Sequence, residues 1–200
     1  MKRNIAYVLV ALPALLLAMT VNATQNTKPD GLNTIRAQGE GEKMILVVYY
    51  SRTGNTKRVA EDIAAGLNAD SERIMDVKDR SGFFGLFGII GDMIAKKTVP
   101  IQEPKKNPAD YEMIILGTPV WGGTAATPVK TYIEKYKGAF KEIAYFYTSG
   151  SEKEEKILPV LEKLAGIKGK AGIGFTSREL KESKKEEYNK RIAGFISTMK

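Results

Sequence analysis

The stretch "YYSRTGNTKRVAEDIA", from Tyr49 to Ala64, decides the fold and raises the first question about function. It follows the apolar run "MILVV" and leads into Val59, Ile63 and Leu67, which share one face of a predicted helix. A turn that joins a strand to a helix directs backbone N–H groups and the helix N-terminus toward one point, which favours an anion such as phosphate. A turn that only caps the helix is the alternative. The predicted phosphate-binding residues are Ser51, Arg52, Thr53, Gly54, Asn55 and Thr56.

Several kinds of phosphate site and active site are excluded by residues that the chain lacks. The turn matches neither the G-x-x-x-x-G-K-[ST] pattern of nucleotide triphosphate loops nor the three-glycine dinucleotide fingerprint. A phosphatase of similar topology needs a cysteine in this turn, and a response-regulator receiver needs acidic residues where the chain has Tyr50 and Gly117. The chain has no cysteine and no histidine, which excludes thiolate nucleophiles, the usual zinc sites and a Ser-His-Asp triad. Any chemistry must therefore come from carboxylates, hydroxyls, lysine, arginine and tyrosine or from a bound cofactor, and we expect no metal site.

Short apolar runs alternate with helical patterns along the rest of the chain. Strict alternation predicts an α/β fold with a doubly wound, five-stranded parallel sheet and right-handed crossovers. Ligands of such sheets bind beyond the carboxyl ends of the strands. The predicted strands are Met44–Tyr50, Arg73–Val77, Tyr111–Gly117, Glu142–Thr148 and Lys170–Phe175.

Capping patterns predict where the later helices begin. Thr127 followed by Pro128 is typical of an N-cap and first turn, and Ser183 with Glu186 has the spacing of a capping box. Pro159 is expected either near the start of its helix or at a kink. The last helix is predicted to bury the stripe formed by Tyr188, Ile192, Phe195 and Met199.

Two further loops follow predicted strands. The loop "GTPVWGGTAATP", Gly117 to Pro128, contains the only tryptophan, Trp121, and the adjacent glycines Gly122 and Gly123 let the backbone approach a flat ligand closely. This pattern indicates a platform on which an aromatic ring stacks, whereas a tryptophan folded back against the sheet edge is the alternative. The loop "YTSGSEKE", Tyr147 to Glu154, adds further backbone N–H groups and small polar side chains.

Taken together, "LVVYYSRTGNTKRVAEDIA", "YEMIILGTPVWGGTAATPVKTYIEKY" and "YFYTSGS" resemble the flavodoxin family of FMN-binding proteins. The resemblance covers nearly all of residues 43 to 200 and implies the strand order 2-1-3-4-5, FMN as the cofactor and a phosphate held by residues 51 to 56. It also implies that Trp121 stacks on the isoalloxazine ring. The implied ring-contacting residues are Thr118, Pro119, Val120, Trp121, Gly122 and Gly123, with Thr148, Ser149 and Gly150 at the pyrimidine end.

Three functions are consistent with this resemblance. The favoured one is an exported electron-transfer flavoprotein, in which FMN does the redox chemistry and no catalytic side chain is required. Many flavodoxins cover the second flavin face with a tyrosine that the stretch "TSGSEKEE" lacks, so an FMN-dependent NAD(P)H:quinone or flavin reductase is the first alternative. A flavin-free binding module on the same fold is the second alternative.

The N-terminal region is expected to direct export. Lys2 and Arg3 precede the apolar run Ile5–Met19, which is typical of a signal peptide that is cleaved after Ala23. The expected organisation is a signal peptide at 1–23, a flexible polar linker at 24–42 and one FMN-binding domain at 43–200, with a periplasmic or other extracytoplasmic location. Retention by an uncleaved anchor is the alternative.

The remaining patterns bear on partners. The formal net charge is +8, but acids and bases alternate in stretches such as Lys181–Arg191, which indicates a solvated helix face and not a nucleic-acid surface. The expected partner is a redox protein or a quinone, with weak attraction to anionic lipid and an oligomeric state that the sequence leaves open. The apolar stretch Ser81–Lys97 is expected to be a helix packed on the sheet, or else a flap over the flavin or a patch for a membrane or quinone-bearing partner.

Overall fold

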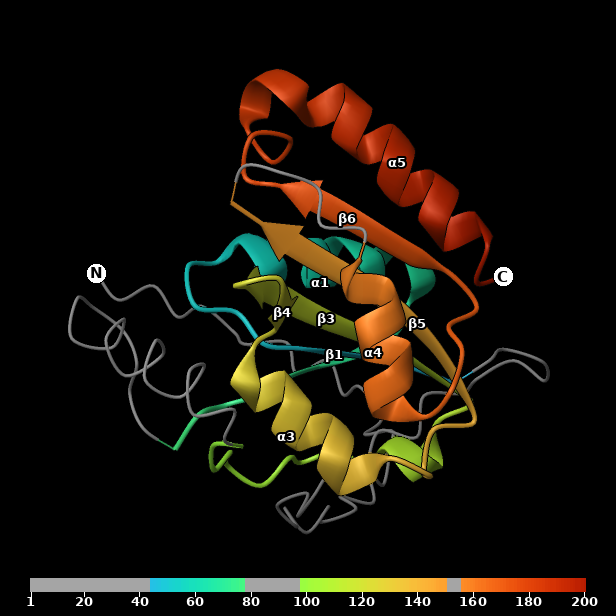
Figure 1. Ribbon diagram of the computed structural model, residues 1–200. Helices are drawn as coiled ribbons and strands as arrows, with labels where there is room; N and C mark the ends of the chain where they lie inside the picture. The colour runs from blue at the N-terminus through green and yellow to red at the C-terminus, as the bar shows by residue number, and fades with distance from the viewer. Residues whose placement is uncertain (1–43, 78–97, 151–155) are drawn as a thin grey trace, which may run out of the picture. The chain divides into compact units, whose positions relative to one another are not determined.

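The computed structural model describes residues 44–77, 98–150 and 156–200, which all belong to the unit Glu40–Lys200 (Figure 1). Strands alternate with helices as the sequence predicts. The strands are β1 (Ile45–Tyr49), β2 (Asp70–Arg73), β3 (Met113–Trp121), β4 (Thr124–Ala125), β5 (Glu142–Ser149) and β6 (Gly172–Thr176). The α-helices are α1 (Asn55–Leu67), α3 (Thr127–Tyr136), α4 (Ile157–Ala165) and α5 (Lys185–Ser197), and two short 3-10 helices are η1 (Pro108–Asp110) and η2 (Glu182–Lys184).

The sheet has the order β2-β1-β3-β5-β6, and every neighbouring pair along this path is parallel. Counted along the chain without β4, this is the order 2-1-3-4-5 that the resemblance implies, so the fold prediction is confirmed. The short strand β4 pairs antiparallel with the end of β3. Because β1, β3 and β5 are adjacent and parallel, their carboxyl ends meet at one edge (Figure 1).

Helices cover both faces of the sheet, with α3 and α4 on one face and α1 and α5 on the other (Figure 1). The side chains of β1 alternate between two hydrophobic clusters. Leu46 and Val48 join the cluster beneath α3 and α4, while Ile45 and Val47 join the cluster beneath α1 and α5. A strand buried on both faces needs this continuous apolar run, which is why "ILVV" is apolar at every position.

Aromatic side chains of β5 occupy space that glycines on the neighbouring strands leave open. A Cβ atom on Gly117 of β3 would lie 2.0 Å from the ring of Phe146, and one on Gly174 of β6 would lie 2.0 Å from the ring of Tyr147. Phe146 and Tyr147 are both buried. The run "YFY" therefore depends on small residues in the adjacent strands, because any larger side chain would overlap the rings.

The predicted position of the second strand is wrong. The parallel partner of β1 is the polar segment Asp70–Arg73, and Arg73 is the only residue that it shares with the predicted strand Arg73–Val77. Downstream of β2, Asp76 instead forms an antiparallel bridge with Ile101. The reason is that β2 lies at the edge of the sheet, where exposed polar side chains are tolerated and an apolar run is not required.

The predicted helix starts agree only in part with the structure. Helix α3 begins at Thr127, but Ala126 is its N-cap, one residue before the predicted one. The capping box of Ser183 and Glu186 does not form, because η2 occupies Glu182–Lys184 and α5 follows with Lys184 as an N-cap that makes no side-chain hydrogen bond. Pro159 lies in the first turn of α4, as one of its two expected placements requires. The stripe of the last helix is confirmed for Tyr188, Ile192 and Phe195, whereas Met199 is buried but lies beyond the end of α5 at Ser197.

The predictions for residues 1–42 and for Ser81–Lys97 lie outside the described residues. Among the helices that are described, none is both long enough and apolar enough to cross a membrane.

Candidate functional site

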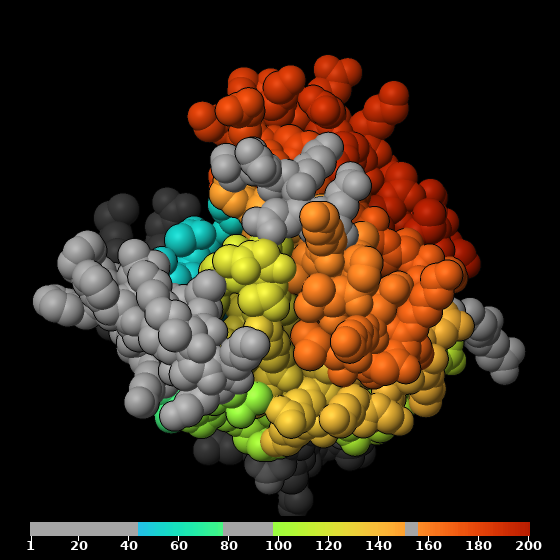
Figure 2. Space-filling view, in the orientation of Figure 1, coloured from blue at the N-terminus to red at the C-terminus, as the bar shows by residue number. Residues whose placement is uncertain are grey.

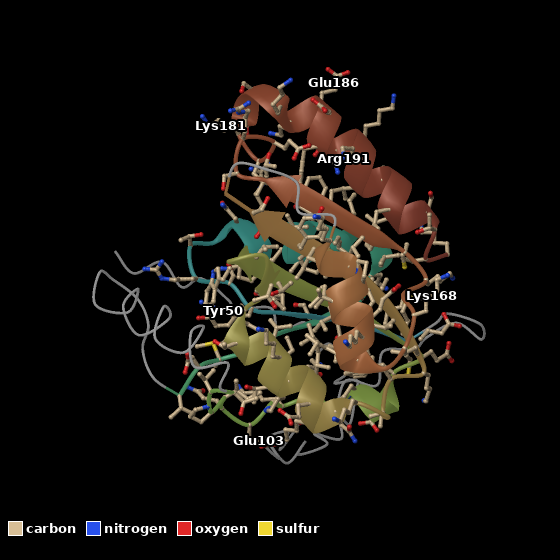
Figure 3. All side chains as sticks on the ribbon, viewed as in Figure 1. Tyr50, Glu103, Lys168, Lys181, Glu186 and Arg191 are labelled. Carbon is tan, nitrogen blue, oxygen red and sulfur yellow. The ribbon has the colours of Figure 1, made fainter. Side chains whose placement is uncertain are left out.

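The three loops singled out in the sequence lie at the carboxyl edge of the sheet. Tyr49 of β1 pairs with Gly117 of β3, and Gly117 pairs with Phe146 of β5, so the loops that follow these strands are neighbours. In Figure 2 the cyan surface of the turn after β1 lies beside the yellow surface of the segment after β3. Figure 3 labels Tyr50 at this edge and Lys168 at the opposite one.

The turn after β1 exposes backbone at the start of a long helix. Gly54 is the N-cap of the 13-residue helix α1 and has a φ of 95°, a conformation that glycine adopts without strain. Its N–H donates to Ser51 Oγ at 3.2 Å, and Ser51 is buried. Within the described residues, no side chain caps the N-terminus of α1. The first N–H groups of this helix are therefore available to bind an anion at the sheet edge.

An arginine that the sequence analysis missed supports this turn. Arg73, the last residue of β2, donates from Nη2 to the carbonyl oxygen of Ser51 at 2.7 Å. The bond fixes the start of the turn and brings a positive charge next to it. A correct placement of β2 would have identified Arg73, because the end of β2 adjoins the end of β1 in this strand order.

Two buried hydroxyls join the first and third loops. Thr56 Oγ1 and Thr148 Oγ1 lie 2.8 Å apart, and both side chains are buried. Thr56 is the second residue of α1, and Thr148 is near the end of β5. The predicted phosphate turn and the loop after β5 are thus linked directly.

A second link passes through Ser177, which follows β6 and which the sequence analysis also missed. Asn55 Nδ2 donates to Ser177 Oγ at 3.1 Å, and Ser177 Oγ donates to the carbonyl oxygen of Ser149 at 3.1 Å. Ser177 N–H donates to the same carbonyl at 2.9 Å. No local sequence signal identifies Ser177, because 122 positions separate it from Asn55 along the chain.

The segment around Trp121 is a β-hairpin and not the open loop that the sequence analysis expects. Val120 pairs with Ala125 and Trp121 with Thr124, which leaves Gly122 and Gly123 as a two-residue turn. Their φ values of 55° and 74° are those of a type I′ turn, which requires positive φ at both positions. The Gly-Gly pair between these residues was the available sequence signal.

Trp121 packs back against the sheet edge, which is the alternative considered for it. Its ring packs edge to face against Tyr50, with centroids 5.6 Å apart and planes at 90°, and it contacts the hydrophobic cluster beneath α3 and α4. The side chain nevertheless remains partly exposed at the carboxyl edge. Tyr50 is buried, so it supports Trp121 from within and leaves part of the indole available to a ligand.

Thr118 has a structural role in the same hairpin. Its buried hydroxyl donates to the carbonyl oxygen of Pro119 at 2.9 Å and accepts from the N–H of Ala126 at 3.0 Å. These bonds use the side chain within the protein, so Thr118 holds the hairpin at its base.

The remaining candidate residues differ in exposure. The structure brings all three loops to one edge of the sheet. The buried candidates are Ser51, Thr56, Thr118, Thr148 and Ser149, the partly buried ones are Arg52, Asn55, Pro119, Val120 and Trp121, and the exposed ones are Thr53, Gly54, Gly122, Gly123 and Gly150.

The phenol of Tyr49 carries no charge next to this turn at neutral pH. Burial raises the pKa of Tyr49, the residue just before the turn, and Glu61 raises it further, while Arg73 lowers it. Tyr49 therefore stays neutral at neutral pH. Among the residues that the structure describes, no group of three or more His, Cys, Asp or Glu side chains is arranged to hold a metal ion.

Comparisons with known proteins agree with this geometry. A family model described as Flavodoxin matches residues 91–189. A flavoprotein from Lactobacillus acidophilus NCFM, solved in complex with FMN, is 25% identical with a TM-score of 0.58, over 69% of this chain and 96% of that one. A protein from Bacteroides uniformis ATCC 8492 that is assigned as a flavoprotein is 24% identical with a TM-score of 0.63, over 76% and 98% of the two chains. From its strand order and these matches, the chain has a flavodoxin-like fold.

Proposed function

We propose that this protein binds FMN at the carboxyl edge of its sheet and transfers electrons. The observation that carries the proposal is the uncapped N-terminus of α1 next to the hairpin that presents Trp121. One half of the site suits a phosphate, and the other half suits a flat aromatic ring. FMN has both groups, and its isoalloxazine ring supplies the redox chemistry.

The residues of the first turn fit the phosphate end. The N–H groups that open α1 and the hydroxyl of Thr53, which is exposed, donate to phosphate oxygens. Arg73 holds the start of the turn through Ser51 and adds positive charge. A hydroxyl has one proton to donate and can also accept a hydrogen bond. If Thr148 donates its proton to Thr56 Oγ1, the proton of Thr56 is left to donate to the phosphate.

The other two loops fit the ring. Trp121 stacks on one flavin face, held by its contact with Tyr50. The residues Thr148 to Gly150 reach the pyrimidine end through backbone groups, because the carbonyl of Ser149 is already bound by Ser177 and the hydroxyl of Thr148 by Thr56. The FMN named for the Lactobacillus acidophilus protein supports this choice of ligand.

The proposal extends to location and partner. The apolar run Ile5–Met19 and the small residue Ala23 support export with cleavage after Ala23, and a redox protein or quinone is the proposed electron acceptor or donor. Mass spectrometry of the protein from an expressing cell tests the cleavage. An intact N-terminus on exported protein would support the anchored form instead.

Titration of FMN into the full-length protein tests the proposed function. We expect flavin fluorescence to be quenched with saturation at one FMN per chain, and Trp121→Ala to weaken binding about tenfold, which corresponds to the loss of one stacking contact. Ser183→Ala, an exposed position in η2 outside the three candidate loops, is the matched control. Absence of saturable binding in the folded protein would leave the flavin-free module, whereas steady turnover of NAD(P)H by the loaded protein would favour the reductase.

A further inference from the structure

We propose that Ser177 is a positioning residue that makes the site select FMN over riboflavin. This inference rests on the proposed function. Ser177 lies after β6 and outside the three loops assigned to the ligand, yet it contacts two of them. The ends of β5 and β6 and the start of α1 lie together at the carboxyl edge (Figure 1).

The direction of the hydrogen bonds follows from the groups involved. A carbonyl oxygen only accepts, so the single proton of Ser177 Oγ is donated to Ser149. The oxygen of Ser177 then has only lone pairs to offer Asn55, which must present its Nδ2 donor. The two hydrogen bonds therefore run in one direction, from Asn55 to Ser177 to Ser149, and each bond strengthens the other.

These two hydrogen bonds fix the orientation of the Asn55 side chain. Asn55 is the first residue of α1, next to the N-cap Gly54, and its side chain is partly buried. With Nδ2 held by Ser177, the first turn of the helix is fixed before a ligand arrives. A fixed turn loses less entropy on binding phosphate, which raises affinity for FMN in particular.

Loss of the Ser177 hydroxyl should affect the phosphate end only. In Ser177→Ala the carbonyl of Ser149 retains the backbone N–H of residue 177 as a donor, at 2.9 Å in the present protein. Asn55 Nδ2 loses its acceptor in that variant. The ring-contacting loop is thus kept, while the phosphate-binding turn is released.

The experiment measures dissociation constants for FMN and riboflavin in the full-length protein by fluorescence quenching. Because riboflavin lacks the phosphate, we expect Ser177→Ala to weaken binding of FMN about fivefold and binding of riboflavin by less than about twofold. A fivefold loss is the effect of one hydrogen bond. Ser177→Thr should restore FMN affinity, and Asn55→Ala should give the same selective loss as Ser177→Ala. In the double variant the losses should not add, because both changes break one link.

The outcomes separate the two proposals. Equal weakening of FMN and riboflavin by Ser177→Ala, or no weakening of either, overturns the role of Ser177 while FMN binding stands. Additive losses in the double variant overturn it as well. A wild-type protein that is folded and binds neither flavin overturns the proposed function together with this inference. If Ser177→Ala does not fold, the same measurement is made on Asn55→Ala. Equal changes in affinity for FMN and riboflavin relative to wild type in that variant overturn the role of Ser177.

Discussion

Thr56 Oγ1 and Thr148 Oγ1 lie 2.8 Å apart in the interior, although 92 positions separate them along the chain. The pair joins the first turn of α1 to the end of β5. Each hydroxyl is buried, so loss of one leaves the other without this partner.

Replacement of each threonine with valine, which keeps the shape of the side chain, should distinguish the contributions of the two hydroxyls to stability and to FMN binding. We expect Thr148→Val and Thr56→Val each to lower the free energy of unfolding by about 1–2 kcal/mol, and the double variant to cost less than the sum. Thr56→Val should also weaken FMN at least about tenfold, while Thr148→Val has a smaller effect. Urea unfolding and FMN titration measure both quantities. Strict additivity of the unfolding energies would show that the hydroxyls do not depend on one another.

A second prediction concerns the packing of β5. Gly117→Ala and Gly174→Ala each place a Cβ 2.0 Å from an aromatic ring, so we expect each to lower the free energy of unfolding by about 1–3 kcal/mol. Gly194→Ala is the matched control, because a Cβ there meets no atom within 4 Å and the residue lies inside α5. Alanine in a helix should raise stability by about 1 kcal/mol. Thermal unfolding of the three variants measures the difference in stability between them. Adding Phe146→Leu should reduce the destabilisation caused by Gly117→Ala but not that caused by Gly174→Ala.

These two predictions illustrate what the sequence can and cannot provide. The continuous apolar runs of β1, β3 and β5 were recognisable because both faces of a central strand are buried. The edge strand β2 was misplaced because its residues "DSER" carry no apolar signal. The strand order came from the family resemblance and not from any pattern within the chain.

The residues of the candidate site also fall into those that the sequence indicates and those that it does not. The turn at Ser51–Thr56 and the tryptophan loop were recognisable because their residues are contiguous. Arg73 and Ser177 were not, because their contacts with Ser51 and Asn55 exist only after folding brings distant segments together. The role of Thr118 at the base of the hairpin was equally hidden, since a hydroxyl that binds its own backbone resembles one that is free to bind a ligand.

The Gly122–Gly123 turn yields a third prediction. Both residues have positive φ, so alanine at either position should cost about 1 kcal/mol, whereas Gly122→Asn should be tolerated because asparagine adopts this conformation readily. The turn sets the position of Trp121 through its pairing with Thr124. We therefore expect Gly123→Ala to shift the tryptophan emission and to weaken FMN, with Gly122→Asn close to wild type. Equal effects from alanine and asparagine at position 122 would contradict a type I′ turn.

The last prediction concerns the buried tyrosines and pH. Burial raises the pKa of Tyr132 and Tyr188 above the ordinary value of 10.0, and Asp62 adds to the effect at Tyr188, whose hydroxyl donates to Asp62 Oδ2 at 2.5 Å. A raised pKa in the folded state gives stability that is fully present below pH 10 and is lost as pH rises above it, by about 1.4 kcal/mol per pH unit for each tyrosine. Tyr132 Oη has no hydrogen-bond partner in the described part of the chain, so Tyr132→Phe should raise the free energy of unfolding at pH 8 by about 1 kcal/mol, while Tyr188→Phe should lower it by a similar amount. Urea unfolding from pH 8 to pH 11 measures both effects, and either variant should show a shallower fall above pH 10 than the wild type. A loss of stability in Tyr132→Phe would mean that its hydroxyl is bonded after all.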